Sequence, residues 1–498
     1  MTTESDPSPT DHAMGREVSL AFIAKVLLAA LGFVGSVVFA RRLGPAAFGA
    51  FYVLLTVGRL LDRPLNGLAG AAKHRFAGSH ADTGELVGLL WIAVFATVAL
   101  IGLGAFAFAP QLRAYADHPA APSLLILLVG ALGTIVVSTT LVSATGRVSI
   151  ESGLSLLASV LTIPLQIGLV VLGYGIWGMT AGFVIGSVVA AGVGFAFVGV
   201  RPRLPSRPTL KSVWEYARFN ILSRVVNKAY SRFDVLLLAW LFSTTAAGYY
   251  EVAWKVTIPA IYVAHSIASS MVARTSEALS EGSLSTTAAD IRAGRNYGSI
   301  LALPLLGGAL VLSERVVVTL YGPEYAAAST LLIGLAAYQV VRTQTLPYVA
   351  ALDGADRPDL SFKIGVATLC ANIVLGVALA LTLGPVGVVI ATIASETGRH
   401  VLGRRAVGSA LELSIGRPTG VYAQTVAAAT MTVMVWALAR GLTTLSQTSP
   451  TSWSALLGLV TVGAASYGAG LVALYDPARD ALRRVLTSRT RMQPTNSD

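Results

Sequence analysis

The chain has 498 residues, of which 54% are hydrophobic and 12% are charged, and its formal net charge is +11. Soluble globular proteins carry about 25% charged residues, so this composition excludes that class and indicates an integral membrane protein. The excess of positive charge would suggest nucleic acid as the partner of a soluble protein. Here most of it falls in loops between apolar segments, so we expect no nucleic-acid binding.

Apolar segments of about 20 residues, the length that crosses a bilayer, recur along the chain from Gly15 onwards. They lie at about 18–40, 46–70, 84–109, 122–144, 151–173, 176–199, 213–242, 246–273, 297–313, 326–351, 361–383, 386–406, 419–440 and 453–475. The sequence therefore predicts an all-α polytopic membrane protein with about 14 transmembrane helices.

The polar N-terminus has no basic region followed by an apolar cleavable segment, so we expect the first span to stay as an anchor. The single cysteine, Cys370, and six scattered histidines give no disulfide framework and no metal-ligand spacing. Neither a phosphate-binding Gly-x-x-x-x-Gly-Lys-Ser/Thr loop nor a His-Glu-x-x-His motif is present. We therefore expect no catalytic residues, no metal and no cofactor, and the short outer loops also argue against an enzyme.

The loops show how the chain is oriented. With the N-terminus inside, 22 basic residues fall in cytoplasmic segments and 5 in outer segments, which is a strong positive-inside signal. We therefore expect a multi-pass protein of the plasma membrane with both termini in the cytoplasm.

Nine basic residues remain within or close to the spans, against four carboxylates at comparable depth. The basic residues are Lys25, Arg59, Arg63, Arg218, Arg224, Lys228, Arg232, Lys255 and Arg342. The carboxylates are Asp62, Asp234, Glu251 and Glu396. Glu251 with Lys255, and Arg59 with Asp62 and Arg63, are spaced for local pairing on one helix. The remaining excess of positive charge suits an anionic cargo that enters from the cytoplasm.

The seventh span carries the densest group of cations. Arg218, Arg224, Lys228 and Arg232 fall within about 120° of one helical face. A cation at bilayer depth costs about 2.5–3.5 kcal/mol, so four of them need water, partners or an anionic ligand. An amphipathic surface helix explains Arg218 well but the residues nearer the apolar run poorly, so we favour a polar cavity.

The candidate residues for binding phosphate or glycan are Lys25, Arg59, Arg63, Arg224, Lys228, Arg232, Arg342, Asn66, Asn220 and Asn227. The candidate coupling carboxylates are Asp62, Asp234 and Glu396. Gln166, Gln339, Gln344 and Asn372 could also meet sugar hydroxyls, but hydrogen bonding between helices is the expected role for most of these amides. Charge-paired packing and snorkelling at the inner interface are the structural alternative for the cations.

The two halves of the chain resemble each other. Gly49 and Gly248 occupy matching turns after the first and seventh spans, at an offset of 199 residues, and Arg147 and Arg357 begin the fifth and eleventh spans at an offset of 210. Repeats of this kind in transporters place the substrate site between the halves.

We therefore predict two six-helix lobes in parallel pseudo-repeat plus two C-terminal helices. The predicted divisions are a tail (1–17), an N-lobe (18–200), a basic linker (201–212), a C-lobe (213–410), two further spans (411–475) and a basic cytoplasmic tail (476–498).

Four motifs point to a family. Leu43-Gly-Pro-x-x-Phe-Gly-x-Phe-Tyr52, Leu320-Tyr-Gly-Pro-Glu-Tyr325, Asn372-Ile-Val-Leu and Leu383-Gly-Pro-Val-Gly387 resemble the polysaccharide (Wzx-type) flippases of the multidrug/oligosaccharidyl-lipid/polysaccharide exporter superfamily. The resemblance implies two six-helix lobes around a central cleft. Asp62-Arg-Pro-Leu-Asn66-Gly looks most like archaeal members that serve glycosylation on dolichyl phosphate.

The resemblance implies a flippase that moves a polyprenyl-(di)phosphate-linked sugar or oligosaccharide to the outer face, for polysaccharide or glycoprotein biosynthesis. Its expected partners are the polyprenyl-linked glycan, membrane lipids, and the glycosyltransferases or the oligosaccharyltransferase or polymerase of the same pathway. A cation-coupled drug or metabolite antiporter of the same superfamily is the first alternative. The first span holds Lys25 and no acid, which argues against that reading. A membrane glycan polymerase or glycosyltransferase is the second.

Overall fold

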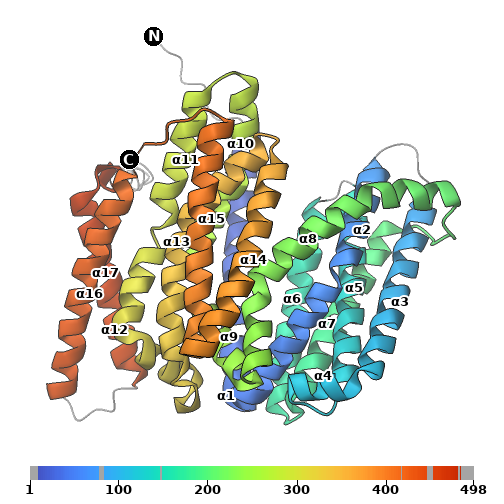
Figure 1. The fold of residues 1–498 in the computed structure, drawn as a ribbon, viewed down its shortest axis with the longest axis horizontal. Coiled ribbons are helices and arrows are strands. Elements are labelled where there is room, and N and C mark those ends of the chain that lie inside the picture. The colour runs from blue at the N-terminus through green and yellow to red at the C-terminus, as the bar shows by residue number, and fades with distance from the viewer. Residues whose placement is uncertain are drawn as a thin grey trace, which may run out of the picture. The chain divides into compact units, whose positions relative to one another are not determined.

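A computed structural model describes residues 9–77, 83–145, 148–416, 418–445, 452–480 and 483. Within these ranges it does not cover the side chains of 9–26, 74, 76–77, 148–149, 216, 219–220, 222–229 and 443–445. The regular structure in these ranges is helical throughout (Figure 1). The elements are α1 (Pro9–Leu61), α2 (Arg63–Ala77), α3 (Thr83–Ala107), α4 (Ala109–Ala116), α5 (Ala121–Ala144), α6 (Val148–Val171), α7 (Gly175–Val198), α8 (Arg207–Leu241), α9 (Thr244–Thr257), α10 (Pro259–Ser280), α11 (Leu284–Gly298), α12 (Ala302–Tyr321), the 3-10 helix η1 (Pro323–Tyr325), α13 (Ala328–Gly354), α14 (Pro358–Leu383), α15 (Pro385–Ala410), α16 (Thr419–Leu445) and α17 (Trp453–Leu474).

The helices have the length and composition of membrane spans. Over the described residues, nine are long and apolar enough to cross a bilayer, or ten if the bent pair α9–α10 counts as one span. Large apolar side chains also face outwards, as Leu100 and Leu103 of α3 and Leu381 of α14 do at more than 70% exposure. Such surfaces suit lipid tails rather than water. The prediction of an all-α polytopic membrane protein is confirmed, and the number of fourteen crossings stays a prediction.

The Gly-Pro dipeptides of the sequence motifs are where helices break. Gly44 (φ 72°), Gly322 (φ 109°) and Gly384 (φ 64°) all have a left-handed backbone, which side chains with a Cβ rarely adopt. A proline follows each of them, and its fixed φ and missing N–H suit the first turn of the next helix. Three of the four motifs that indicated the family therefore encode breaks between helical segments, and the fourth, at Asn372, lies inside α14.

The chain divides into two compact units at Gly248. In the first unit, α2, α3, α5 and α8 share an apolar core that contains Leu65, Leu86, Leu90, Val137 and Val213. The contacts of α8 place it in this unit, whereas the sequence assigned the span at 213–242 to the C-lobe on the basis of the repeat. A unit held together by contacts need not coincide with a sequence repeat, so the predicted boundaries of the two lobes stay a prediction.

The basic linker before α8 is held against the start of α3. Arg203 donates its backbone N–H to the carbonyl oxygen of Gly84 at 2.8 Å. The Glu85 carboxylate accepts from the backbone N–H and the hydroxyl of Ser206 and from the hydroxyl of Thr209, at 2.5–3.1 Å. A carboxylate in this place caps the first turn of α8, where backbone N–H groups lack partners. The linker therefore fixes where α8 begins.

In the second unit, α10 and α11 form a hairpin that the sequence analysis had treated as a span followed by a loop. The bidentate pair between Arg274 and Asp290, with N–O distances of 2.7 and 3.0 Å, closes it. Helices α16 and α17 pack against α12 through a separate apolar core (Figure 1). The predicted outer loop after α3 contains the short helix α4.

Candidate functional site

The turn between α1 and α2 gathers four of the predicted site residues. Asp62 is buried at 1% exposure, and its Oδ2 accepts a hydrogen bond from Nδ2 of Asn66 at 2.5 Å. Arg59 and Arg63 act electrostatically on the same carboxylate, and Arg63 Nε donates to the carbonyl oxygen of Arg59 at 2.9 Å. The three charged residues therefore lie together at this turn, as the spacing indicates. The second carboxylate oxygen, Oδ1, is buried and has no hydrogen-bond partner in the described part of the chain.

Helix α2 carries this charged turn directly against α8. A methyl group added at Gly67 would lie 3.0 Å from Cα of Ile221, so only glycine allows the two backbones to approach this closely. Because Ile221 lies between Arg218 and Arg224 in sequence, α2 packs beside the basic part of α8. The first unit thus brings together two groups of candidates that are more than 150 residues apart in the chain.

Helix α8 contains most of the remaining candidates of the first unit. Arg232 is half-buried and Asp234 is buried at 4% exposure, whereas Arg218 near the start of the helix is exposed. The predictions for the side chains of Lys25, Asn220, Arg224, Asn227 and Lys228 lie outside the described residues. The shared basic face of α8 therefore stays a prediction from sequence.

In the second unit, Arg342 of α13 is supported by aromatic side chains. Its Nη1 donates to the hydroxyl of Tyr338 at 2.5 Å, and its Cζ lies 5.7 Å from the centroid of the same ring. Tyr338 packs on Trp254 of α9 with 5.9 Å between ring centroids, and Trp254 stacks on Tyr250 at 6.2 Å. A guanidinium held in this way has little freedom, so it is preorganised for an anion.

Helices α14 and α15 pack together, and each carries buried polar residues. Glu396 and Ser395 of α15 are buried, and so is Asn372 of α14, at 0% exposure. Neither Asn372 Nδ2 nor Oδ1 has a hydrogen-bond partner in the described ranges, and the same holds for Ser395 Oγ. Buried polar groups normally find partners, so Asn372 and Ser395 have unused capacity to form hydrogen bonds.

The structural roles expected for several other polar residues are confirmed. Gln166 donates to the carbonyl oxygen of Met179 at 2.7 Å, and Gln339 donates to the hydroxyl of Thr257 at 3.2 Å. Gln344 exchanges hydrogen bonds with Arg295, at 3.2 and 3.0 Å. These three glutamines therefore bond between helices, as predicted.

Lys255 pairs with Glu251 one helical turn away, with 3.6 Å between Nζ and Oε1. This ion pair is the local one that the spacing indicates.

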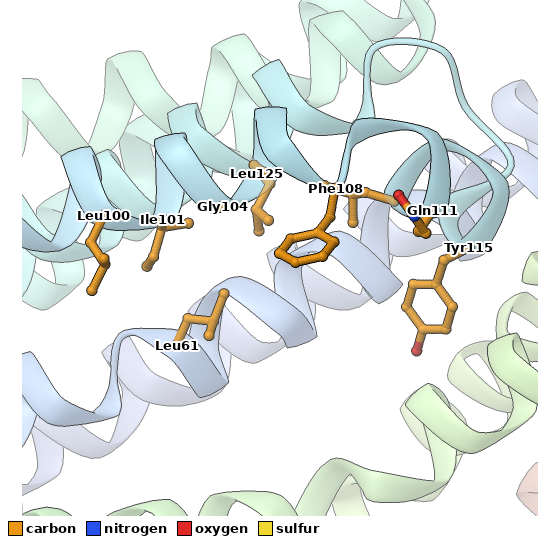
Figure 2. A pocket seen from close by; sticks show the side chains of 10 residues that line it. Leu61, Leu100, Ile101, Gly104, Phe108, Gln111, Tyr115 and Leu125 are labelled. Carbon is orange, nitrogen blue, oxygen red and sulfur yellow. The ribbon is translucent and has the colours of Figure 1, made fainter.

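An apolar pocket of about 560 Å³ lies in the first unit (Figure 2). Leu61, which precedes the charged turn, lines it together with Leu100 and Phe108, and Gln111 and Tyr115 of α4 supply its polar atoms. The hydroxyl of Tyr115 already donates to the carbonyl oxygen of Leu236, at 2.9 Å. Such a lining suits a hydrocarbon chain and cannot solvate a sugar or a phosphate.

Sequence reasoning missed the supports of these residues. In the sequence, Tyr338 and Trp254, which support Arg342, look like ordinary residues of membrane spans. Tyr338 precedes Arg342 by one helical turn, and that spacing was the available signal. Arg295 was assigned to a cytoplasmic loop but is buried at 9% exposure in α11. Across the described residues, no three His, Cys, Asp or Glu side chains are grouped as metal ligands.

Comparison with solved structures defines the class of protein. The lipid II flippase MurJ in an inward closed conformation covers 93% of this chain and 99% of its own, with a TM-score of 0.75 and 14% identity. An inward-facing MATE transporter of the MOP superfamily covers 79% and 99%, with a TM-score of 0.61 and 18% identity. At this identity the likeness shows the fold alone, which this chain shares with both of these transporters.

The family is shown by the sequence. The model of the polysaccharide biosynthesis protein family (Polysacc_synt_3) matches residues 38–330, more than half of the chain, and the chain belongs to this family. Two relatives from Haloferax volcanii are named flippases. "Probable flippase AglR" is 26% identical over 95% of this chain and 98% of its own. "Probable low-salt glycan biosynthesis flippase Agl15" is 24% identical over 76% and 80%. The predicted resemblance is confirmed, and the protein is a transporter rather than an enzyme.

Proposed function

We propose that the protein is a flippase that moves a polyprenyl-(di)phosphate-linked sugar or oligosaccharide from the cytoplasmic to the outer face of the plasma membrane. The observation that carries the proposal is the match to AglR over nearly the full length of both chains. The cations of α8 and of the α1–α2 turn support an anionic cargo rather than a cationic drug. The Asp62-to-Asn66 segment extends the proposal to dolichyl-phosphate-linked substrates.

The chemistry of the candidates suits the parts of such a substrate. Arginine binds phosphate through two parallel N–H donors, which is the role proposed for Arg59, Arg63 and Arg342. Asparagine amides such as Asn66 would meet sugar hydroxyls. The prenyl chain would stay in apolar surroundings, in lipid or in a pocket of the kind that Leu61 and Phe108 line.

The carboxylates are proposed to couple transport to an ion or proton. Asp62 and Glu396 are almost completely buried, each at 1% exposure. A buried carboxylate that binds and releases a cation changes the charge of its surroundings by one unit, which can bias one conformation over another. Asp234 on α8 is the third candidate.

The orientation of the chain in the membrane is a separate prediction. Reporter fusions after Arg75 and after Arg207 are expected to read cytoplasmic, and a fusion near Arg113 is expected to read external, because basic loops stay inside. An internal reading near Arg113 would reverse the orientation and with it the proposed direction of transport.

The function is tested in a strain that lacks the gene. We expect a lipid-linked glycan intermediate to accumulate on the cytoplasmic face, with unchanged resistance to drugs. Because the glycan would still be made, the block should appear after the glycosyltransferases and before the oligosaccharyltransferase or polymerase. Raised drug sensitivity with unaltered glycolipids would favour the antiporter instead.

A further inference from the structure

Arg295 on α11 is a buried cation with few partners. It is 9% exposed, and its Nε donates to Oε1 of Gln344 at 3.2 Å. Its terminal nitrogens make no hydrogen bond to the described residues, and no described carboxylate lies within ion-pair distance of it. A guanidinium offers five N–H donors, and burying it without an opposite charge is costly. Gln344 therefore satisfies only one of the hydrogen-bond donors of this side chain and none of its charge.

A second cation acts electrostatically on the first. Arg404 of α15 is exposed and acts electrostatically on Arg295, and it too has no ion pair with a described residue. Two like charges close together disfavour each other unless an anion lies between them or beside them. Two carboxylates of the same unit act on other groups: Glu396 on His400, and Asp353 on Arg399.

Two further polar groups at the same place have unused hydrogen-bonding capacity. The ring of Tyr348 lies 5.5 Å from Cζ of Arg295 and 5.3 Å from the ring of His400. Its hydroxyl is completely buried, lies within the electrostatic reach of both Arg295 and Arg404, and has no hydrogen-bond partner in the described ranges. Nδ1 of His400 is buried without a partner as well.

We propose that Arg295, Arg404 and the hydroxyl of Tyr348 form an anion site within the second unit that binds a phosphate group. A phosphate offers several oxygens, enough for two guanidinium groups and a hydroxyl at once. The phosphate comes from the head group of an anionic lipid or from free inorganic phosphate. None of these three residues is a candidate of the proposed substrate site, and the inference does not depend on the proposed function.

The test uses the purified full-length protein. Binding of inorganic phosphate is measured by thermal shift in a neutral detergent, and binding of phosphatidylglycerol is measured by native mass spectrometry, with phosphatidylcholine as reference. We expect Arg404→Gln and Tyr348→Phe each to weaken phosphate or phosphatidylglycerol binding about tenfold, the loss of one charge-assisted hydrogen bond or more. Binding of phosphate alone identifies a free anion, and binding of phosphatidylglycerol alone identifies a lipid; either result supports the site.

Two features keep the test decisive. Arg274→Gln is the matched control, because it removes the same charge from the neighbouring α10 but from an arginine that Asp290 already neutralises. Tyr348→Phe removes only a buried hydroxyl without a partner, so the unliganded variant should be as stable as the parent protein. If neither probe binds, or if Arg404→Gln and Tyr348→Phe bind as well as Arg274→Gln does, the proposal is overturned.

Discussion

Replacing Gly49 or Gly248 by alanine is expected to lower the amount of folded protein in the membrane sharply. A methyl group at Gly49 would overlap the carbonyl oxygen of Thr244 and lie 2.8 Å from the backbone nitrogen of Gly248. A methyl group at Gly248 would overlap the carbonyl oxygen of Pro45. The obstacles are backbone atoms, which cannot move aside as the end of a side chain can, so the helices must separate. Overpacking of this kind costs about 1–3 kcal/mol or more.

The effect is measured as membrane abundance and as thermal stability in detergent. Gly168→Ala is the matched control: this glycine lies inside α6, and an added methyl group would meet nothing within 4 Å. Alanine favours a helix over glycine by about 0.5–1 kcal/mol, so this variant should be as abundant as the parent protein or more so. Equal abundance of Gly49→Ala and Gly168→Ala would show that the close approach of α1 and α9 is not needed.

This contact also marks what the repeat could and could not predict. Gly49 and Gly248 were matched in the sequence as equivalent positions of two halves, each in a turn after an outward span. The structure places Gly49 inside α1 and Gly248 inside α9, and the backbones of these two helices lie against each other there. A sequence shows that two segments are alike, but not that they touch, because that depends on how whole helices pack.

Structural features that depend on residues close together in the sequence were predictable. The Leu-Gly-Pro motifs end helices because glycine adopts positive φ and proline begins the next turn. The pairs within one helical turn, such as Lys255 with Glu251 and Asp62 with Asn66, follow from the 3.6-residue period. The apolar runs likewise predicted where membrane spans lie.

Structural features that depend on residues far apart in the sequence were not predictable. Helix α11 contains Arg292, Arg295 and Asp290. Because of these charged residues its segment has low hydrophobicity, so the sequence predicted a loop there. Arg295 is buried there by Gln344 and Tyr348, about 50 residues further along the chain. In the same way, the close approach of α2 to α8 requires a glycine at position 67, and no local pattern identifies its partner Ile221.

The second large effect is expected on transport. Arg342→Ala should reduce flipping of the lipid-linked glycan roughly ten- to a hundredfold, because one charge-assisted contact to phosphate is worth about 1.5–3 kcal/mol. Arg342→Lys should restore part of the activity, since a point charge replaces a two-donor fork. Tyr338→Phe should have a smaller effect, because the cation–π contact with the ring remains when the hydroxyl is lost. Arg224→Ala and Arg224→Lys on α8 are expected to follow the same pattern.

Abundance and transfer measured side by side separate a binding role from a structural one. If Arg342 binds substrate, its alanine variant folds and inserts normally but transfers little glycan. Lys255→Ala is the comparison within the same unit: it removes the ion pair with the buried Glu251, so its effect should fall on abundance. If Arg342→Ala lowers the abundance of the protein as Lys255→Ala does, then Arg342 is a packing residue and not a binding residue. Normal abundance with normal transfer in both Arg342→Ala and Arg224→Ala would place the substrate cavity elsewhere, because neither cation would then contribute to holding a phosphate.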